Sequence, residues 1–228
     1  QKTFAHCYFD SSKVDEMFRQ LTSRSDVNYY RYNFFHSNYL ISKNKEEKAK
    51  EIIKLSLDQY PKNLILNQLK FDLEKKNIFQ NKFDCKNAID VIAEIFYVAS
   101  NGLAAQNNYM ISNFYLSLAR YLNPNFVAFD TLHAENFFLI QEYEKAKEIY
   151  TEIKKKGTIY NWHASKQITS ILKRQNKNKE ALNNLKKSFE KIANPRIYEI
   201  FDYAEFLKDN EKYKESIEYY SKVLNLID

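Results

Sequence analysis

The chain contains few of the residues on which tight turns and nucleotide-binding loops depend. Its 228 residues include two glycines and three prolines. Sheet-rich folds and α/β enzymes need many turns with positive φ, and glycine is the usual residue there. Gly102 and Gly157 are far apart, which excludes glycine-rich phosphate loops of the GxGxxG or Walker type. The scarcity of glycine favours helices joined by short polar turns.

Cysteine and long apolar runs are also scarce. Cys7 and Cys85 form no CxxC motif, and we expect both to be free thiols that pack as small apolar side chains. No run of 18 or more apolar residues occurs, so we expect no transmembrane segment. The chain begins with Gln1 and not with Met, which indicates a trimmed N-terminus. A cytoplasmic and a periplasmic location therefore both stay open.

The positive charge comes mostly from lysine. The formal net charge is +6, and the chain contains 29 lysines but only 6 arginines. A surface that binds phosphates usually favours arginine, whose planar guanidinium makes two parallel hydrogen bonds. Asparagine, isoleucine, tyrosine and phenylalanine are abundant too, which is typical of an AT-rich genome. We therefore do not expect nucleic acid to be the main partner.

Small residues recur in this sequence at a spacing of 34 or 35 positions: Ser112, Ala146, Ala181 and Ser216. Four positions after each comes a larger anchor: Leu116, Tyr150, Leu185 and Tyr220. An internal repeat of this length indicates stacked helical hairpins. Small residues would stand where two helices cross, because packed helix axes are only about 8–10 Å apart.

Apolar residues at helical spacing predict the individual helices. The predicted ranges are 30–42, 46–59, 64–76, 93–105, 109–122, 126–140, 143–154, 162–175, 178–192, 197–210 and 213–227. A proline that follows a helix cannot continue its hydrogen bonds, and Pro61, Pro124 and Pro195 stand at such places. A polar break at 77–87 precedes an apolar helix that begins near Ala88.

The repeated frame resembles the tetratricopeptide repeat. The frame is visible in Ala204…Tyr213…Ser216…Tyr220…Val223, in Ala134…Tyr143…Ala146…Tyr150 and in Ser100…Tyr109…Ser112…Ala119…Pro124. The segment 159–185 and the last unit are most similar to long repeat proteins of alphaproteobacteria. The sequence departs from the motif at Ser165 and Ile200, which replace an aromatic residue, and at His36 and His133, which stand where leucine is usual.

This resemblance implies an all-α fold, a right-handed superhelix of antiparallel helix pairs. We expect one continuous solenoid with a partial repeat at 1–29, repeats at 30–63, 93–126, 127–161, 162–196 and 197–228, and a degenerate repeat with the polar break at 64–92. No polar capping helix follows Tyr219 and Leu226. These uncapped ends predict a longer array or an end-to-end contact between copies.

The resemblance also implies that the first helix of each pair lines a concave groove. The candidate groove residues are Phe34, Asn38, Tyr97, Asn101, Glu135, Phe138, Lys166, Ser170, Phe201 and Glu205. A side-chain amide donates and accepts together, so Asn38 and Asn101 match the backbone of an extended peptide. The aromatic candidates favour an apolar or amphipathic ligand. The alternative is that Phe34, Tyr97 and Phe138 pack between repeats.

No pattern of residues indicates catalysis. The four histidines, His6, His36, His133 and His163, have no metal-binding spacing, and we expect His36 and His133 to be packed helix residues. No catalytic triad or cofactor motif is present. We therefore predict a non-catalytic scaffold without metal or cofactor, which binds a peptide or helical segment of a protein partner. An RNA-binding helical-repeat protein and a structural subunit of a bacterial envelope assembly are the alternatives.

Overall fold

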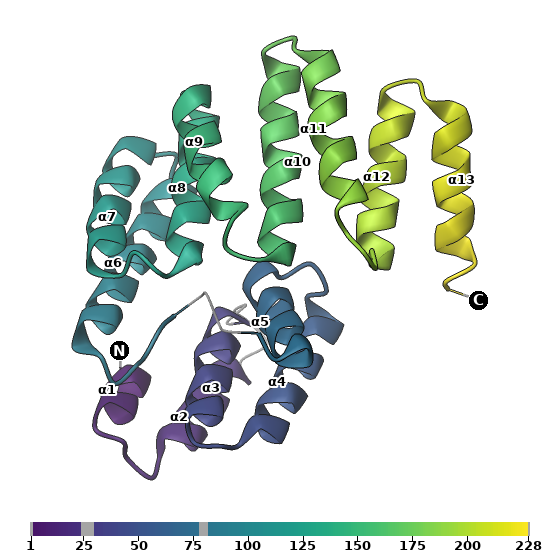
Figure 1. The fold of residues 1–228 in the computed structure, drawn as a ribbon. Helices are drawn as coiled ribbons and strands as arrows, with labels where there is room; N and C mark the ends of the chain where they lie inside the picture. The colour runs from purple at the N-terminus through teal and green to yellow at the C-terminus, as the bar shows by residue number, and fades with distance from the viewer. Residues whose placement is uncertain (1, 24–29, 78–81, 228) are drawn as a thin grey trace. The chain divides into compact units, whose positions relative to one another are not determined.

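The computed structural model describes residues 2–23, 30–77 and 82–227, and these residues form helices and no strand (Figure 1). The helices are α1 (Lys2–Tyr8), α2 (Val14–Thr22), α3 (Tyr30–Ser42), α4 (Glu46–Gln59), α5 (Leu64–Lys75), α6 (Ala88–Ala105), α7 (Tyr109–Leu122), α8 (Val127–Leu139), α9 (Tyr143–Ile153), α10 (Thr158–Arg174), α11 (Asn178–Glu190), α12 (Ile197–Asp209) and α13 (Tyr213–Leu224). The predicted all-α architecture of paired helices is confirmed. The handedness and the repeat boundaries stay predictions.

The chain divides into two compact units, residues 1–149 and 150–228, and the division falls within α9. Unit 1 contains the pairs α1–α2, α3–α4 and α6–α7, with α8 packed on α7. Helix α5 follows α4 and lies against both α3 and α4. Unit 2 contains the pairs α10–α11 and α12–α13.

The helices of the α6–α7 pair cross at two serines. Ser100 and Ser112 are completely buried, and each hydroxyl donates to the backbone carbonyl of the other residue, at 3.1 and 2.9 Å. The hydroxyl of Ser112 also accepts a hydrogen bond of 2.8 Å from Asn136 on α8. A hydroxyl at this crossing is small enough for close approach and satisfies the polar groups that become buried.

Unit 2 uses the same device. Ser216 on α13 donates to the backbone carbonyl of Ala204 on α12 at 2.9 Å, and both residues are buried. Ala181 on α11 is also completely buried. The predicted close crossings are therefore confirmed at Ser100–Ser112 and at Ala204–Ser216. The apolar core around the α12–α13 pair contains Trp162, Leu185, Phe189, Ile200, Tyr203, Phe206, Leu207 and Val223.

The turns within the hairpins adopt positive φ without glycine. Such turns recur at Asn107, Gln141, Asn176 and Glu211, with φ between 59° and 65°. Their spacing is 34, 35 and 35 residues, which repeats the period of the small residues. Asparagine tolerates this left-handed conformation better than most residues, whereas glutamine and glutamate have no such advantage. The short turn of each hairpin therefore imposes the left-handed conformation on whichever residue stands there.

Cys7 and Cys85 form a disulfide, so the expectation of two free thiols is wrong. Their Cα atoms are 5.8 Å apart, within the usual range for a disulfide. The segment before α6 returns to α1 across a sequence separation of 78, and no local pattern in the sequence indicates that return. By loop-closure entropy, a cross-link over this length stabilises the fold by about 4–5 kcal/mol.

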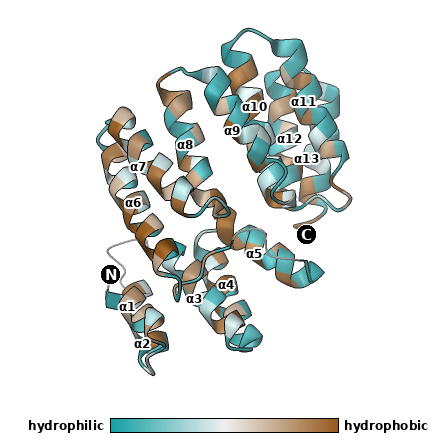
Figure 2. Ribbon diagram, turned by 60° about the vertical axis from the view of Figure 1, so that its left-hand side comes forward, coloured by the Kyte–Doolittle hydropathy of each residue, from teal (hydrophilic) through white to brown (hydrophobic). Residues whose placement is uncertain are grey.

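Helix α6 is the most apolar element of unit 1, and most of it has the hydrophobic colour in Figure 2. Within the described residues, it is the one helix whose length and composition would allow it to cross a membrane. The core helix of a soluble protein can have the same length and composition. Two carboxylates of α6, Asp90 and Glu94, are buried and hydrogen-bonded within unit 1.

Replacing Ser112 by leucine tests the crossing of α6 and α7. The larger side chain would separate the helices and remove the hydrogen bond to Ser100, so we expect Ser112→Leu to lower the free energy of unfolding by about 2–4 kcal/mol. Ser117 is exposed on the same helix, and Ser117→Leu should change that free energy by less than about 0.5 kcal/mol. Urea denaturation of both variants gives the comparison. Equal losses would contradict the role assigned to the crossing.

Candidate functional site

The first groove candidate, Phe34, is a core residue. Its side chain is 1% exposed, and its ring lies 5.7 Å from that of Phe126 and 5.8 Å from that of Phe35. The start of α8 covers the face of α3 on which Phe34 lies. Phe34 therefore cannot contact a ligand on the surface, and the alternative of packing between helices holds for this residue.

The two asparagines predicted to hold a peptide lie in different surroundings. Asn38 is half-buried and lines a pocket of about 420 Å³ between α3 and residues 82–90. Asn101 is exposed on α6. Asn38 therefore faces a segment of its own chain, whereas Asn101 is accessible to a partner.

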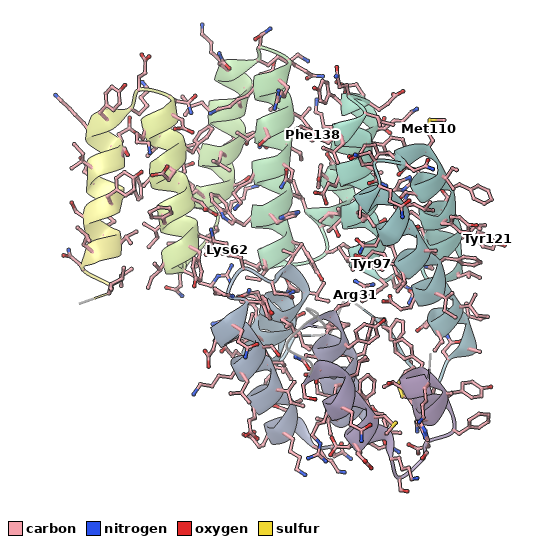
Figure 3. All side chains as sticks on the ribbon, turned by 180° about the vertical axis from the view of Figure 1, so that it is seen from behind. Arg31, Lys62, Tyr97, Met110, Tyr121 and Phe138 are labelled. Carbon is pink, nitrogen blue, oxygen red and sulfur yellow. A yellow bond between two sulfur atoms is a disulfide. The ribbon has the colours of Figure 1, made fainter. Side chains whose placement is uncertain are left out.

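Tyr97 lies beneath Arg31, whose side chain is 14% exposed. The guanidinium of Arg31 is 3.7 Å from the centroid of the Tyr97 ring and 5.0 Å from that of Phe126 (Figure 3). The same guanidinium donates to both carboxylate oxygens of Glu94, at 2.7 and 2.6 Å. Cation–π contacts and a two-bond ion pair together hold Arg31 in place. Tyr97 is therefore part of this cluster, and replacing it would disturb the fold as well as the surface.

Glu94, the partner of Arg31, lies on α6. Its side chain is 1% exposed, and burial raises the pKa of its carboxyl, an effect that the charge of Arg31 opposes. The pair places a positive and a negative charge side by side, so the face of α6 next to it carries no net charge. This arrangement allows an apolar surface to surround a buried carboxylate.

A groove of about 610 Å³ lies between α1 and α6. Its lining is almost entirely apolar, and Glu94 is the one ionisable carboxylate in it. The lining residues are Phe4, Ala5, Tyr8, Phe9, Tyr32, Ala88, Val91, Ile92, Glu94, Ile95 and Val98. Between 43% and 51% of the surface of Ile92, Ile95 and Val98 is exposed, and Phe9 is 78% exposed. Exposed aliphatic and aromatic side chains gathered on one face are typical of a surface that contacts a partner.

The residues of this groove were not predicted from the sequence. On α6 the repeat frame selects Tyr97 and Asn101, but the groove uses the face that contains Ile92, Ile95 and Val98. The apolar run of α6 is visible in the sequence. Its exposure is not, because it depends on where α1 lies.

The remaining candidates in unit 1 are on α8. Glu135 is exposed, and Phe138 is half-buried with its ring 5.7 Å from that of Tyr143. On α7, Met110 and Tyr121 point outward, with exposed fractions of 77% and 85% (Figure 3). These side chains add exposed apolar area to unit 1 outside the α1–α6 groove.

The candidates of unit 2 are engaged within that unit. Lys166 forms an ion pair of 2.5 Å with Asp202, and Ser170 donates to the backbone carbonyl of Lys166 at 3.1 Å. Phe201 is 42% exposed, and its ring is 5.9 Å from that of Tyr220. These three side chains stand on α10 and α12, and Lys166 is already paired with Asp202.

Glu205 is the fourth candidate of unit 2. It accepts hydrogen bonds from Lys208 and Tyr220, and the bonds from these two residues lower its pKa. A carboxylate held in this way stays charged at neutral pH, so unit 2 presents a polar surface here.

Apolar side chains of α13 are exposed among charged ones such as Lys214 and Glu218. Ile217 and Leu224 are each 63% exposed. Tyr219, which we placed at the uncapped end, instead packs inward against Phe189 and Tyr203. Leu226, which we also placed at that end, is 56% exposed.

The histidines of the first helices are buried, as predicted. Nε2 of His36 is 2.7 Å from a carboxylate oxygen of Asp15 on α2, and its ring stacks on Phe18 at 5.0 Å. Nδ1 of His133 is 2.9 Å from a guanidinium nitrogen of Arg120 on α7. Both partners lie on other helices. Within the described residues, no three histidine, cysteine, aspartate or glutamate side chains are placed to hold a metal ion.

Comparisons with known proteins identify no family for the chain. No family model matches it, and no curated protein matches its sequence. Among solved structures, one named "MamA RS-1 ArsTM double mutant" is 12% identical, with 93% of each chain covered and a TM-score of 0.43. A tetratricopeptide repeat protein from Parabacteroides merdae is 12% identical, with 98% of this chain and 90% of that chain covered and a TM-score of 0.42. Similarity at this level carries no argument about function.

Removing one charge of the Arg31–Glu94 pair should destabilise unit 1. Glu94→Gln would leave the guanidinium buried without a counter-charge, and we expect it to cost about 3–5 kcal/mol of unfolding free energy. Glu46→Gln is the control, because it removes an exposed carboxylate from Lys50 and should cost at most about 1 kcal/mol. Urea denaturation measures both. A cost for Glu94→Gln no larger than that of the control would contradict the structural role of the pair.

Acid should weaken the fold through His133 and His163. Burial lowers the pKa of each imidazole from 6.5 to about 4, so the folded chain resists a proton that the unfolded chain accepts. Above pH 6.5 the two histidines therefore cost the fold almost nothing, and the free energy of unfolding falls as the pH drops below that value. Each histidine should cost about 2 kcal/mol at pH 5.

The check on this effect is the free energy of unfolding at pH 7 and at pH 5. His133→Gln should reduce the difference between the two values by about 2 kcal/mol, because glutamine does not titrate. A wild-type chain that is equally stable at both pH values would contradict this assignment.

Proposed function

We propose that the chain is a non-catalytic protein-interaction scaffold and that unit 1 binds an amphipathic helix of a partner in the α1–α6 groove. The observation that carries the proposal is the groove itself, with Ile92, Ile95 and Val98 on one wall and Tyr8 and Phe9 on the other. Both walls are helical, and the space between them is lined by apolar side chains.

The shape of the groove favours a helical occupant. The wall of α6 runs from Ala88 to Val98, which is about 15 Å or three helical turns. A partner helix with apolar residues at positions i, i+3 or i+4, and i+7 presents a stripe of that length. Burying this stripe would contribute roughly 25 cal/mol for each Å² of apolar surface removed from water.

The electrostatics of the groove favour an apolar contact over an ionic one. Glu94 is paired with Arg31, so the lining offers no unpaired carboxylate to a cationic ligand. The described residues that line the groove include no lysine or arginine that could contact a phosphate backbone. A protein partner with an apolar helical face therefore fits the groove better than RNA does.

A charge placed in the groove tests this function. Ile95→Glu should reduce the amount of a partner that the full chain captures by at least tenfold, because a carboxylate would be buried against apolar side chains. Leu139→Glu on α8 is the matched control, since Leu139 is 49% exposed but does not line the groove, and should capture the partner as the wild type does. Circular dichroism verifies that both variants keep their helices. Equal capture by Ile95→Glu and the control would remove the groove from the proposal.

A further inference from the structure

A short non-helical segment, residues 82–87, lies against helices of unit 1 far from it in the sequence. It precedes α6, and its Phe83 contacts α1 and α3. The pocket that contains Asn38 is formed by α3 on one side and by this segment on the other. The segment thus lies beside the helix on which the sequence analysis placed a peptide.

Phe83 is the anchor of the segment. Its side chain is 7% exposed, and its ring centroid lies 4.2 Å from that of Phe35, 5.4 Å from that of Phe126 and 5.7 Å from that of Phe4. These three rings come from α3, from the residue before α8 and from α1. Rings from three separate elements surround this aromatic side chain, and the anchor residue of a bound ligand is surrounded in a pocket in the same way.

An asparagine amide holds the backbone of the same segment. Asn123 is 5% exposed, and its Nδ2 donates to the carbonyl of Lys82 at 3.0 Å. The amide nitrogen of Lys82 donates to the carbonyl of Asn125 at 3.4 Å. Contacts to a carbonyl and an N–H do not depend on the side chain of the residue that is held. Asn123 thus holds a backbone by a side-chain amide, the kind of contact predicted for Asn38 and Asn101.

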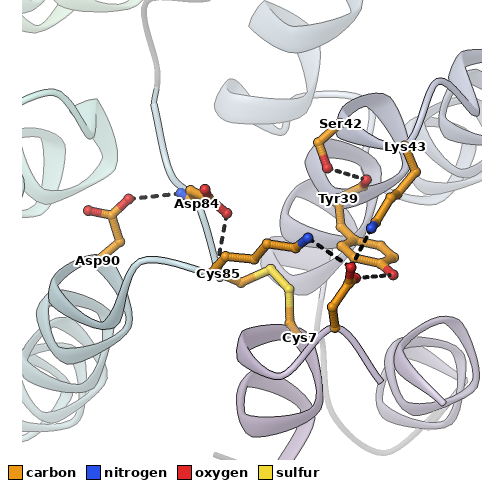
Figure 4. Close-up of a disulfide and its surroundings, with 9 residues drawn as sticks. Cys7, Tyr39, Ser42, Lys43, Asp84, Cys85 and Asp90 are labelled. Atoms are coloured by element: carbon orange, nitrogen blue, oxygen red, sulfur yellow. Dashed lines mark hydrogen bonds and ion pairs between the residues drawn. A yellow bond between two sulfur atoms is a disulfide. The ribbon is translucent and has the colours of Figure 1, made fainter. Parts of the chain in front are cut away.

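Two further contacts fix the end of the segment (Figure 4). Cys85 is bonded to Cys7 of α1, and both residues are buried. The ammonium of Lys86 is 3.0 Å from the carboxylate of Asp10, which also pairs with Lys43 at the end of α3. The covalent bond makes the segment permanent, whereas the other contacts are of the kind that a separate peptide could form.

We propose that Phe4, Phe35, Phe126 and Asn123 form a peptide-binding site, which residues 82–87 fill while the disulfide is intact. The partner of this site is an extended peptide that carries a phenylalanine. The proposal deepens the scaffold function proposed above, and it uses a neighbouring site of unit 1.

Reduction of the disulfide makes the site available. A small dithiol supplies two electrons and two protons, so that Cys7 and Cys85 each become a thiol and the dithiol closes to a cyclic disulfide. The segment then stays connected to α6 by its backbone, but non-covalent contacts alone hold Phe83 in the site, so a partner peptide can compete for the aromatic rings. Before reduction, the disulfide keeps the segment beside the rings and disfavours this competition.

Peptide capture by the full chain tests the site directly. The variant Phe83→Ala/Cys85→Ser removes the internal anchor and keeps Cys7. In a glutathione buffer, Cys7 should form a mixed disulfide with the hexapeptide Lys-Phe-Asp-Cys-Lys-Asn, measured by intact mass. We expect at least tenfold more capture than with Lys-Ala-Asp-Cys-Lys-Asn, and no capture by the oxidised wild type. Equal capture of the two peptides, or none by a variant that keeps its helical circular dichroism, would overturn the proposal.

Hydrogen exchange of the wild type decides the matter if the variant does not fold. Addition of dithiothreitol should speed the exchange of backbone amides in 82–87 at least tenfold and leave those of α3 and α4 unchanged. No change in 82–87, or equal acceleration in α3, would contradict the proposal. A dimer in which Cys7 of one copy is bonded to Cys85 of another would show that a second copy, and not a separate peptide, fills the site. This outcome would overturn the partner proposed here.

These experiments are independent of the groove test. The variant Ile95→Glu keeps every residue of the Phe83 site, and the peptide measurements leave Ile95 unchanged. A negative result in one test therefore leaves the other proposal standing.

Discussion

Helices α6 and α7 can lie close together because two serines meet at their crossing. Each hydroxyl of Ser100 and Ser112 donates to the backbone of the opposite helix, so neither side chain leaves a buried polar group without a partner. The amide of Asn136 then connects α8 to the same point. The faces of α6 and α7 that point toward the crossing contain small residues, whereas several large apolar side chains, among them Ile92, Ile95, Val98 and Phe114, are exposed. The α1–α6 groove exists because α6 turns one of these apolar faces toward α1.

The sequence predicts the helices well because their determinants are local. Most predicted helix ends lie within a few residues of the ends in the structure. They were predicted from the apolar periodicity, the small residues, and the prolines Pro61, Pro124 and Pro195. The polar break was placed correctly before α6, although residues 78–81 lie outside the described part of the chain. The start of α10 is an exception. The predicted helix begins at residue 162, but α10 begins at Thr158, directly after Gly157, and no proline marks this end. The repeated positive φ at Asn107, Gln141, Asn176 and Glu211 was not predicted, since only two of these residues are typical of left-handed turns.

The candidate site could be predicted only in part, because it depends on contacts between distant segments. The repeat frame assigned Phe34 to a groove, but Phe126, 92 positions later, covers it. The frame selected Asn38 and Asn101 as residues that hold a peptide backbone, and this stays a prediction. In the structure, Asn123 donates to a backbone carbonyl of its own chain, a contact that no local pattern indicates. The cysteines show the same limit. Their pairing depends on the return of residues 82–87 to α1, and this return is produced by Phe83 and Asn123 together with Lys86, each of which looks like an ordinary loop residue in the sequence.

The bond between Cys7 and Cys85 also changes how the chain would transmit tension. A pull applied at two points outside this pair would pass from α1 straight to the segment before α6, across the sulfur atoms. Helices α2 to α5 would lie in a closed covalent loop that carries none of the load. Their packing would then survive stretching forces that extend the later hairpins, and the chain would lengthen by less than its number of residues implies.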